Sequence, residues 1–298
     1  MPSDAAKEVA RKLLTELAID YRQHRQRGGL PTHRHIQGLC EDLFGLLIRG
    51  YRQADRSEDD IGKMAEDVAA FQAEIRRATL SVLQFLGNSE DDSLEKSHGL
   101  CDGVLDDLAS VHRLITTDIE AAFANDPAAA ERSTIVLAYP SIQALAIQRF
   151  AHRLYQRGLP IIPRLMTEVV HGRTGIDIHP GAAIGESCFI DHGTGVVIGE
   201  TARIGSHCVL YQGVGLIAWN PLAKDEHGEL RRGASNQRHP TLEDHVTVYA
   251  GASILGGDTV IGHHSVIGGN VWLTRSVDPY SVVTAEAPAL TIRQRGKR

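Results

Sequence analysis

The chain has 298 residues, 42% of them apolar and 23% charged, with a formal net charge of −6 at pH 7. These values are typical of a globular protein with one large domain or two ordinary ones, and the acidic balance argues against nucleic-acid binding. No apolar run is long enough to cross a membrane, and the N-terminus lacks the apolar stretch of a signal peptide. The four cysteines show no CxxC spacing and the fifteen histidines no paired ligand spacing, so we expect a cytoplasmic protein without a metal.

The first 172 residues carry apolar side chains at helical spacing, which predicts an all-helical N-terminal domain (1–172). The predicted helices cover residues 3–23, 35–51, 60–86, 94–123 and 141–158, and a last short helix opens at Pro160 and ends near His171. Glycine, proline and polar clusters separate these segments, as breakers between helices usually do.

A repeat of six residues replaces the helical pattern in the second domain, 173–285, which is followed by a C-terminal tail, 286–298. The aliphatic positions of the repeat are Ile178, Ile184, Ile190, Ile198, Ile204, Leu210, Leu216, Leu242, Val248, Ile254, Ile261, Ile267 and Leu273. Such hexapeptides build a left-handed parallel β-helix, in which three short strands make one turn and stacked turns align their aliphatic side chains into one core. The sequence therefore predicts an α+β protein, helices first and a β-helix after them.

The repeat is widened by two residues between Ile190 and Ile198, where Asp191 and His192 stand. Insertions in such a coil emerge as surface loops. Asp177 lies one turn earlier, and a carboxylate beside an imidazole fixes its tautomer and raises its basicity. The pattern favours a general base at this step, and the alternative is a solvated loop pair without a role.

A longer interruption covers residues 217–240 and carries several basic residues, among them Arg238, followed by His239. A third irregularity, a slip of one residue, falls in the LGGDT stretch at 255–259. The interruption at 217–240 is expected at the surface of the coil, for the same reason as the insertion at Asp191 and His192.

Four segments together resemble the serine O-acetyltransferase family, and most closely its longer, EpsC-like branch. They are GIDIHPGAAIG (175–185), IDHGTGVVIGE (190–200), RHPTLED (238–244) and, upstream, NDPAAAERSTIVLAYPSIQALAIQRFAHRL (125–154). The resemblance covers about residues 120–285. It implies acetyl transfer from acetyl-CoA to the hydroxyl of L-serine, as a step of cysteine biosynthesis and without a covalent enzyme intermediate. It also implies inhibition by L-cysteine and a homotrimer or a dimer of trimers.

The same resemblance implies roles for individual positions. His192 matches the general base and Asp177 its partner, and the positions that hold serine are Asp126, Pro127, Asp191, Arg238 and His239. Arginine suits a carboxylate because its guanidinium binds both oxygens at once. His239 is alternatively structural, and Glu200 is either a helper of the site or a solvated corner residue. Ala250 and Gly268 match positions whose small side chains admit the pantetheine arm of the coenzyme, or else serve only packing.

The stretch VGLIAWN, 214–220, departs from the family, which usually reads VTLGG or VTLGA there. Ile217 stands where glycine is expected and Gly215 where threonine is expected, so Ile217 and Ala218 bear on how acetyl-CoA is received. The chain also ends in Arg298 and not in the isoleucine that many members insert into cysteine synthase, so that complex is not expected through the tail.

Two alternatives to a serine O-acetyltransferase stay open at this stage. Ile217 motivates a related acyltransferase with another acceptor or acyl donor. A catalytically silent regulatory partner in cysteine synthesis is the other alternative, and the joint presence of His192, Asp177, Asp126 and Arg238 argues against it.

Overall fold

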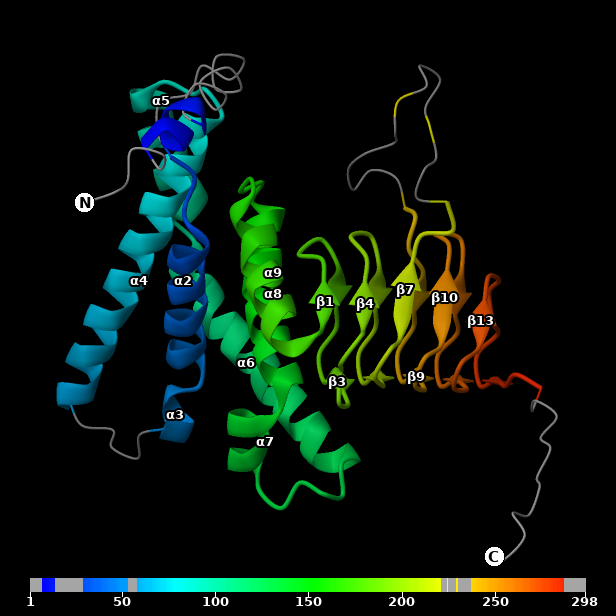
Figure 1. Ribbon diagram of the computed structural model, residues 1–298. Helices are drawn as coiled ribbons and strands as arrows, with labels where there is room; N and C mark the ends of the chain where they lie inside the picture. Colours follow the sequence, from blue (N-terminus) through cyan, green and yellow to red (C-terminus); the bar gives the residue numbers. More distant parts are fainter. Residues whose placement is uncertain are drawn as a thin grey trace, which may run out of the picture.

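The computed structural model describes residues 7–13, 29–52, 58–220, 224, 229 and 237–286, with a helical region on one side and a β-coil on the other (Figure 1). Residues 7–13 are helical, and the helices that follow are α2 (His33–Leu47), α3 (Arg49–Arg52), α4 (Glu58–Phe85), α5 (Glu90–Cys101), α6 (Val104–Asn125), α7 (Arg132–Ala138), α8 (Pro140–Gln156) and α9 (Ile162–Thr174). The rest of the predicted helix 3–23, most of the interruption 217–240 and the tail from residue 287 lie outside the described residues.

Two predicted helices are divided in the structure. The expected helix 94–123 is wrong as a single element, because α5 ends at Cys101 and α6 starts at Val104. Gly103 lies at the break, where a Cβ would stand 2.5 Å from the guanidinium of Arg157, and that guanidinium donates to the Gly103 carbonyl at 3.0 Å. The expected helix 35–51 is likewise split, at Ile48.

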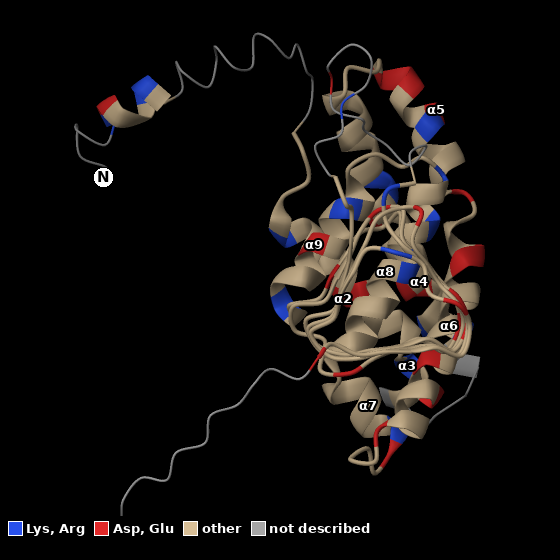
Figure 2. Ribbon diagram, turned by 90° about the vertical axis from the view of Figure 1, so that its right-hand side faces the viewer, with Lys and Arg blue, Asp and Glu red and all other residues tan. Residues whose placement is uncertain are grey.

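The coil consists of very short parallel strands that form three sheets among the described residues. Sheet A orders β1 (Asp177–Ile178), β4 (Val197–Ile198), β7 (Gly215–Ile217), β10 (Ser253–Leu255) and β13 (Trp272–Leu273). Sheet B orders β2 (Ala183–Ile184), β5 (Arg203–Ile204), β8 (Thr241–Leu242) and β11 (Val260–Ile261). Sheet C orders β3 (Phe189–Ile190), β6 (Val209–Leu210), β9 (Thr247–Val248), β12 (Val266–Ile267) and β14 (Val282–Val283). Viewed along its axis, the coil has a three-sided outline with the helices behind it (Figure 2).

The pairing register in sheet A measures each turn of the coil. Val197 pairs with Gly215, eighteen residues later, which is three hexapeptides. Asp177 pairs with Val197, twenty residues later, so the first turn contains the two inserted residues. Gly215 pairs with Ser253 and Ser253 with Trp272, which locates the long excursion in one turn and the single-residue slip in the next. The predicted repeat and its three irregularities are confirmed.

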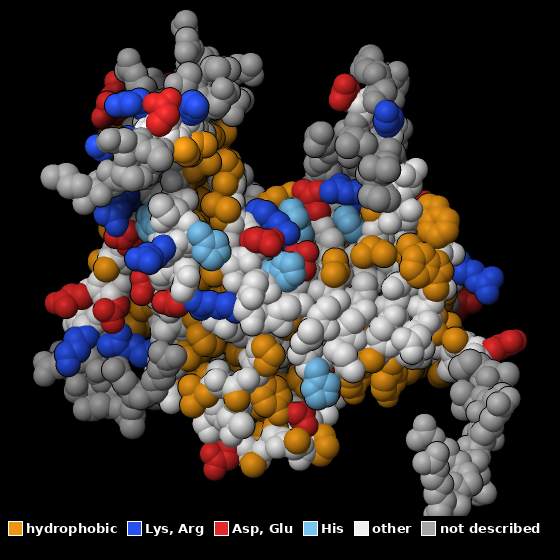
Figure 3. Space-filling model, in the orientation of Figure 1, with side chains coloured by type: hydrophobic (Ala, Val, Ile, Leu, Met, Phe, Trp, Pro, Cys, Tyr) orange, Lys and Arg blue, Asp and Glu red, His pale blue; other side chains and the backbone are white. Residues whose placement is uncertain are grey.

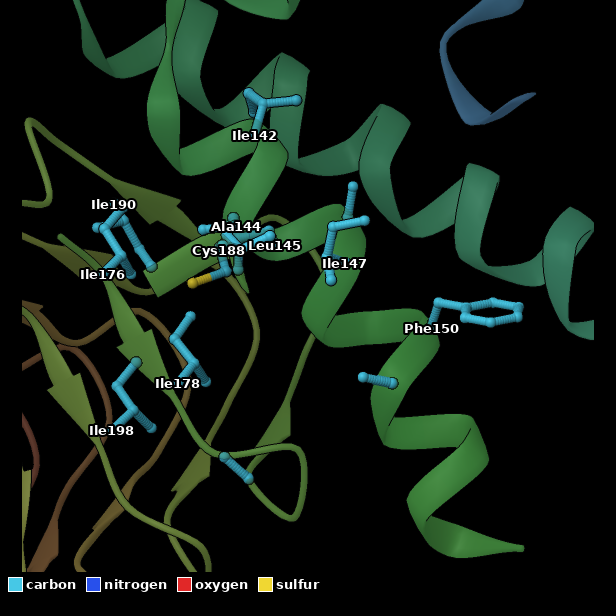
Figure 4. Close-up of a cluster of buried hydrophobic side chains, with 14 of the residues drawn as sticks. Ile142, Ala144, Leu145, Ile147, Phe150, Ile176, Ile178, Cys188, Ile190 and Ile198 are labelled. Carbon is cyan, nitrogen blue, oxygen red and sulfur yellow. The ribbon is translucent and has the colours of Figure 1, made fainter. Parts of the chain in front are cut away.

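The second residue of nearly every strand points inward, and these side chains form the core of the coil. Ile178, Ile190, Ile198 and Leu216 are at most 2% exposed. Figure 4 shows how this core continues into the helices: Cys188 lies beside Ala144 and Leu145 of α8, and Ile147 and Phe150 extend the cluster along that helix. The predicted order of a helical region followed by a parallel coil is confirmed, and the structure adds that the two regions share one hydrophobic core.

Helix α8 covers the open edge of sheet B, where β2 has no preceding strand. Gln148 donates to the Ala182 carbonyl at 2.9 Å, Arg149 to the Ile184 carbonyl at 3.0 Å, and the ring of His152 to the Pro180 carbonyl at 2.8 Å. Arg149 also forms a buried ion pair at 2.8 Å with Asp118 of α6. These contacts satisfy backbone groups that the first turn would otherwise leave unpaired.

No helix in the described part of the chain is both long enough and apolar enough to span a lipid bilayer.

Candidate active site

The corner between β3 and β4, residues 191–196, is where the two inserted residues emerge. His192 and Gly193 have φ angles of 58° and 78°, and Gly195 has 80°. A Cβ at Gly193 would stand 2.4 Å from Ile176 Cδ1, so only glycine fits there. The Gly195 N–H donates to the Gly175 carbonyl at 2.8 Å. With this backbone path, the side chain of His192 is 72% exposed, whereas that of Asp191 is 17% exposed.

Asp126 faces this corner from the turn between α6 and α7. Its Oδ1 accepts the Ala128 N–H at 2.8 Å, and its Oδ2 accepts the hydroxyl of Tyr139. The Tyr139 hydrogen bond, followed by that of Ala128, lowers the pKa of Asp126, and the charge of His192 lowers it further. The same bond raises the pKa of Tyr139 to about 12, with smaller contributions from burial, from the charge of Asp126 and from Asp191. Asp126, Asp191 and His192 therefore form one group, in which an ionised carboxylate faces an exposed imidazole.

Asp177 is not hydrogen-bonded to His192 in the structure. Its Oδ1 accepts from Arg164 at 2.9 Å, and the carboxylate nearest to His192 is that of Asp191, with Oδ2 at 3.6 Å from Nε2. The predicted pairing of Asp177 with His192 is thus absent from this arrangement of side chains and stays a proposal.

One group of metal-ligand types occurs among the described residues, namely Glu168, His171 and Asp177, with ligand atoms within 4.8 Å of one another. The guanidinium of Arg164 donates to Asp177 and to Glu168, at 2.9 Å in each case. Because the guanidinium of Arg164 already balances the charge of both carboxylates, binding of a metal ion between them is disfavoured.

The corner between β4 and β5 holds a second group, and Figure 3 shows imidazole, acidic and basic side chains gathered along that edge of the coil. Glu200 Oε1 accepts the Tyr155 hydroxyl at 2.7 Å, and its Oε2 pairs with Arg238. Burial would raise the pKa of Glu200, but the hydrogen bonds from Tyr155 and Arg238 outweigh it and lower that pKa. Tyr155 packs edge-on against His179, with ring centroids 5.8 Å apart.

His239 is buried at this second corner, and its tautomer is fixed. Nδ1 accepts the Thr201 N–H at 3.1 Å, so the proton of the neutral ring is on Nε2. Burial, followed by the charge of Arg238, lowers the pKa of His239 to about 4. Thr201 Oγ1 in turn accepts the N–H groups of Arg238 and His239, at 3.0 and 3.1 Å. Thr201 therefore holds the segment that carries both predicted serine-binding residues.

The two groups lie on opposite edges of sheet A, because one corner precedes β4 and the other follows it. The predicted coenzyme positions divide in the same way. Ala250 and Gly268 occupy the His192 row of corners, two and three turns further along, or about 10 and 14 Å at the usual spacing of strands. Ile217 ends β7 at the opposite edge, and Ala218 follows it. Pro127 is exposed in the turn next to Asp126.

Several residues of these groups escaped the sequence analysis. Tyr139, Tyr155 and Thr201 hold Asp126, Glu200 and the Arg238–His239 segment, respectively. Tyr139 stands in the upstream segment that carried the resemblance, and Tyr155 directly follows that segment. Nothing in a lone tyrosine shows which carboxylate its hydroxyl will meet.

A parallel coil of hexapeptides that displays a carboxylate and an imidazole on a widened corner is typical of the hexapeptide-repeat acyltransferases. No family model matches the chain. Among curated proteins it is similar to a plasmid-borne serine acetyltransferase of Synechococcus elongatus, with 54% identity over 177 residues, which are 59% of this chain and 54% of that protein. A serine acetyltransferase of Bacillus subtilis is 38% identical over 186 residues, 62% of this chain and 79% of that protein.

Among solved structures, serine acetyltransferase 1 of Entamoeba histolytica in complex with L-cysteine superposes with a TM-score of 0.71 at 36% identity, covering 84% of this chain and 86% of that one. The chain belongs to the serine acetyltransferase family, as its motifs indicated. It spans about half the length of the cyanobacterial relatives that it matches first.

Proposed function

We propose that this chain is a serine O-acetyltransferase, which transfers the acetyl group of acetyl-CoA to the hydroxyl of L-serine and so forms O-acetylserine for cysteine biosynthesis. The observation that carries the proposal is the group on the widened corner, where the ionised Asp126 and the half-buried Asp191 flank the exposed imidazole of His192. Membership in the serine acetyltransferase family supports the same reaction.

His192 acts as the general base in this proposal. It takes the proton of the serine hydroxyl while the serine oxygen attacks the carbonyl carbon of the thioester. The C–S bond then breaks, and the leaving thiolate receives the proton from the imidazolium of His192. Such proton transfer contributes about 10²–10⁴-fold to the rate. Asp177 is the proposed partner of His192, a role that requires its carboxylate to leave Arg164.

The charged ends of serine meet two different groups of residues. Asp126 and Asp191 accept hydrogen bonds from the α-ammonium, and Pro127 fixes the turn that presents Asp126. Arg238 binds the α-carboxylate through two parallel hydrogen bonds, and the Nε2–H of His239 adds a third donor. Glu200 serves as the helper that orients Arg238.

Homotrimer formation would unite the two groups. The segment 196–199 between the two corners spans about 10 Å, more than the distance between the ammonium and the carboxylate of one serine. In a trimer of left-handed coils, the β4–β5 corner of one chain can lie against the β3–β4 corner of its neighbour. Acetyl-CoA would then run along the row of corners past Ala250 and Gly268. The helical regions are the surfaces on which two trimers would pair.

L-cysteine offers the same ammonium and carboxylate as serine, so we propose that it competes for this site. A cytoplasmic setting suits the acetyl-CoA substrate and the four buried free thiols.

The decisive experiment measures thiol release from acetyl-CoA with and without L-serine. We expect release that depends on serine and that rising L-cysteine suppresses by raising the KM for serine. His192→Ala should lower turnover by at least about 10²-fold while the oligomer in size-exclusion chromatography stays unchanged. Unchanged turnover of this variant would overturn the mechanism, and a wild-type chain with no serine-dependent release would overturn the function.

A further inference from the structure

Helix α8 carries a tyrosine at each end, and each tyrosine donates its hydroxyl to a carboxylate of one of the two site groups. Tyr139 is the N-cap residue of α8 and bonds Asp126 beside the β3–β4 corner. Tyr155 lies in the last turn of the same helix and bonds Glu200 at 2.7 Å on the β4–β5 corner. One helix therefore reaches both edges of sheet A.

The body of α8 is fixed between these two ends. Its Gln148, Arg149 and His152 donate to four backbone carbonyls of the first turn, at distances from 2.7 to 3.0 Å. Arg149 is 4% exposed and also holds the fully buried Asp118 through two hydrogen bonds of 2.8 Å. A helix anchored in this way holds its terminal side chains at a fixed separation.

We propose that Tyr139 and Tyr155 are a matched pair of positioning residues, which set the carboxylates of Asp126 and Glu200 so that the two half-sites receive the two charged ends of serine. The inference rests on the proposed function. It assigns the two hydroxyls a role in serine binding and none in the chemical step.

Each hydroxyl acts by occupying one side of its carboxylate. The Asp126 carboxylate receives Ala128 N–H on Oδ1 and the Tyr139 hydroxyl on Oδ2, and its remaining lone pairs are free to face an ammonium group. The Glu200 carboxylate receives the Tyr155 hydroxyl on Oε1, which leaves Oε2 to hold the guanidinium of Arg238. Without the Tyr155 hydroxyl, Oε1 of Glu200 would lose its hydrogen bond, so the carboxylate could rotate together with the guanidinium that it holds, and Arg238 would lose its fixed direction.

The test compares Tyr139→Phe and Tyr155→Phe with the control Tyr280→Phe. Tyr280 is 70% exposed and stacks on His264 at a corner that carries none of the site residues, so its variant should match the wild type. Hydrogen bonds to charged groups predict that kcat/KM for serine falls about 10-fold to 100-fold in each of the two site variants, through KM. KM for acetyl-CoA and the melting temperature should stay near the wild-type values.

Two further readouts separate positioning from a general structural role. Loss of the Tyr139 hydrogen bond raises the pKa of Asp126, so the acid limb of kcat/KM for serine should move to higher pH in Tyr139→Phe only. In a Glu200→Ala background, Tyr155→Phe should add little, because the carboxylate that the Tyr155 hydroxyl positions is already absent.

The inference would be overturned if the losses in that double variant were additive. It would also be overturned if the serine kinetics of both single variants equalled those of Tyr280→Phe. Neither result would affect the serine acetyltransferase activity of the wild type. An equal loss in kcat with KM unchanged would overturn the inference as well. Absence of serine-dependent release from the wild type would instead refute the proposed function.

Discussion

The backbone N–H of Thr201 donates to Nδ1 of His239 at 3.1 Å, and this bond joins two turns of the coil that are 38 residues apart in sequence. Because Nδ1 accepts, the neutral ring carries its proton on Nε2 and can donate to a substrate oxygen. The imidazole lies over Gly199, where a side chain would occupy the same space as the ring. The two alternatives for His239, substrate contact or structural residue, are therefore compatible. The structural hydrogen bond at Nδ1 keeps the proton on Nε2, and Nε2 is the nitrogen that would contact a substrate.

Gly199→Ala should displace His239. A Cβ at position 199 would stand 2.0 Å from both Nε2 and Cδ2 of the ring, so the imidazole has to move. We expect a loss of about 1–3 kcal/mol in the free energy of unfolding. We also expect about a 10-fold to 100-fold fall in kcat/KM for serine. Urea denaturation and the thiol-release assay measure the two effects. Gly99→Ala, on the exposed surface of α5 with open space around the new Cβ, is the control, and kinetics of Gly199→Ala equal to those of this control would refute the role of His239.

His239 should also make stability depend on pH. Its pKa is about 4 in the folded chain and near 6.5 when unfolded, so between these values the unfolded chain binds a proton that the folded chain does not. The free energy of unfolding is therefore expected to fall as pH drops from 6.5 toward 4, by up to about 3 kcal/mol from this group. His152 and His179, whose pKa values burial also lowers, act in the same direction.

Urea titrations at pH 7, 6, 5 and 4.5 check this expectation. His239→Asn should flatten the pH dependence relative to the wild type, whereas His33→Asn, at an exposed position, should leave it unchanged. A His239→Asn profile parallel to that of the wild type would show that the pH dependence arises elsewhere.

The coil could be predicted from the sequence because each turn repeats one local rule, an inward aliphatic every six residues, and the register confirms even the irregular steps at Ile190–Ile198 and in the LGGDT stretch. The split between α5 and α6 was missed, because it depends on Arg157 from a distant helix filling the space beside Gly103. The arrangement of the site was predicted only in part. Motifs mark Asp126 and Arg238, but which edge of sheet A each residue faces follows from the path of the coil. The partner of Asp177 depends on the side-chain conformation of Arg164, which donates to Asp177 in the structure.

The buried pair of Asp118 and Arg149 should be essential to the junction between helices and coil. Asp118 accepts hydrogen bonds from Nε and Nη2 of Arg149, each at 2.8 Å, and from the Cys188 N–H at 2.9 Å. Asp118→Asn leaves the Arg149 charge buried with a weaker partner, so we expect a loss of about 3–5 kcal/mol in the free energy of unfolding. The exposed pair of Glu120 and Arg132 supplies the control, since Glu120→Gln should cost at most about 1 kcal/mol. Similar urea midpoints for the two variants would contradict this account of the junction.

Ile217 should restrict the size of the acyl group. It lies on the outer side of sheet A, and its Cγ2 is 3.6 Å from the place that a Cβ at Gly215 would occupy, so the isoleucine covers the position where the family's threonine side chain begins. In the proposed trimer this edge of sheet A lies against the His192 row of corners of a neighbouring chain, so shortening the Ile217 side chain opens space beside the donor path of that neighbour. Since one methylene in an apolar pocket changes selectivity about 10-fold to 200-fold, Ile217→Ala should raise the turnover ratio of propionyl-CoA to acetyl-CoA by about 10-fold or more.

The measurement is thiol release with acetyl-, propionyl- and succinyl-CoA, each with L-serine and with a panel of other hydroxylated amino acids. Val260→Ala is the matched control, because Val260 is a β-branched residue of sheet B that faces outward and is 36% exposed. The wild type should prefer acetyl-CoA and L-serine, and only Ile217→Ala should accept the longer donor. An unchanged donor ratio in Ile217→Ala would remove Ile217 from the donor path, and a wild-type preference for succinyl-CoA or another acceptor would replace serine acetylation with a related acyl transfer.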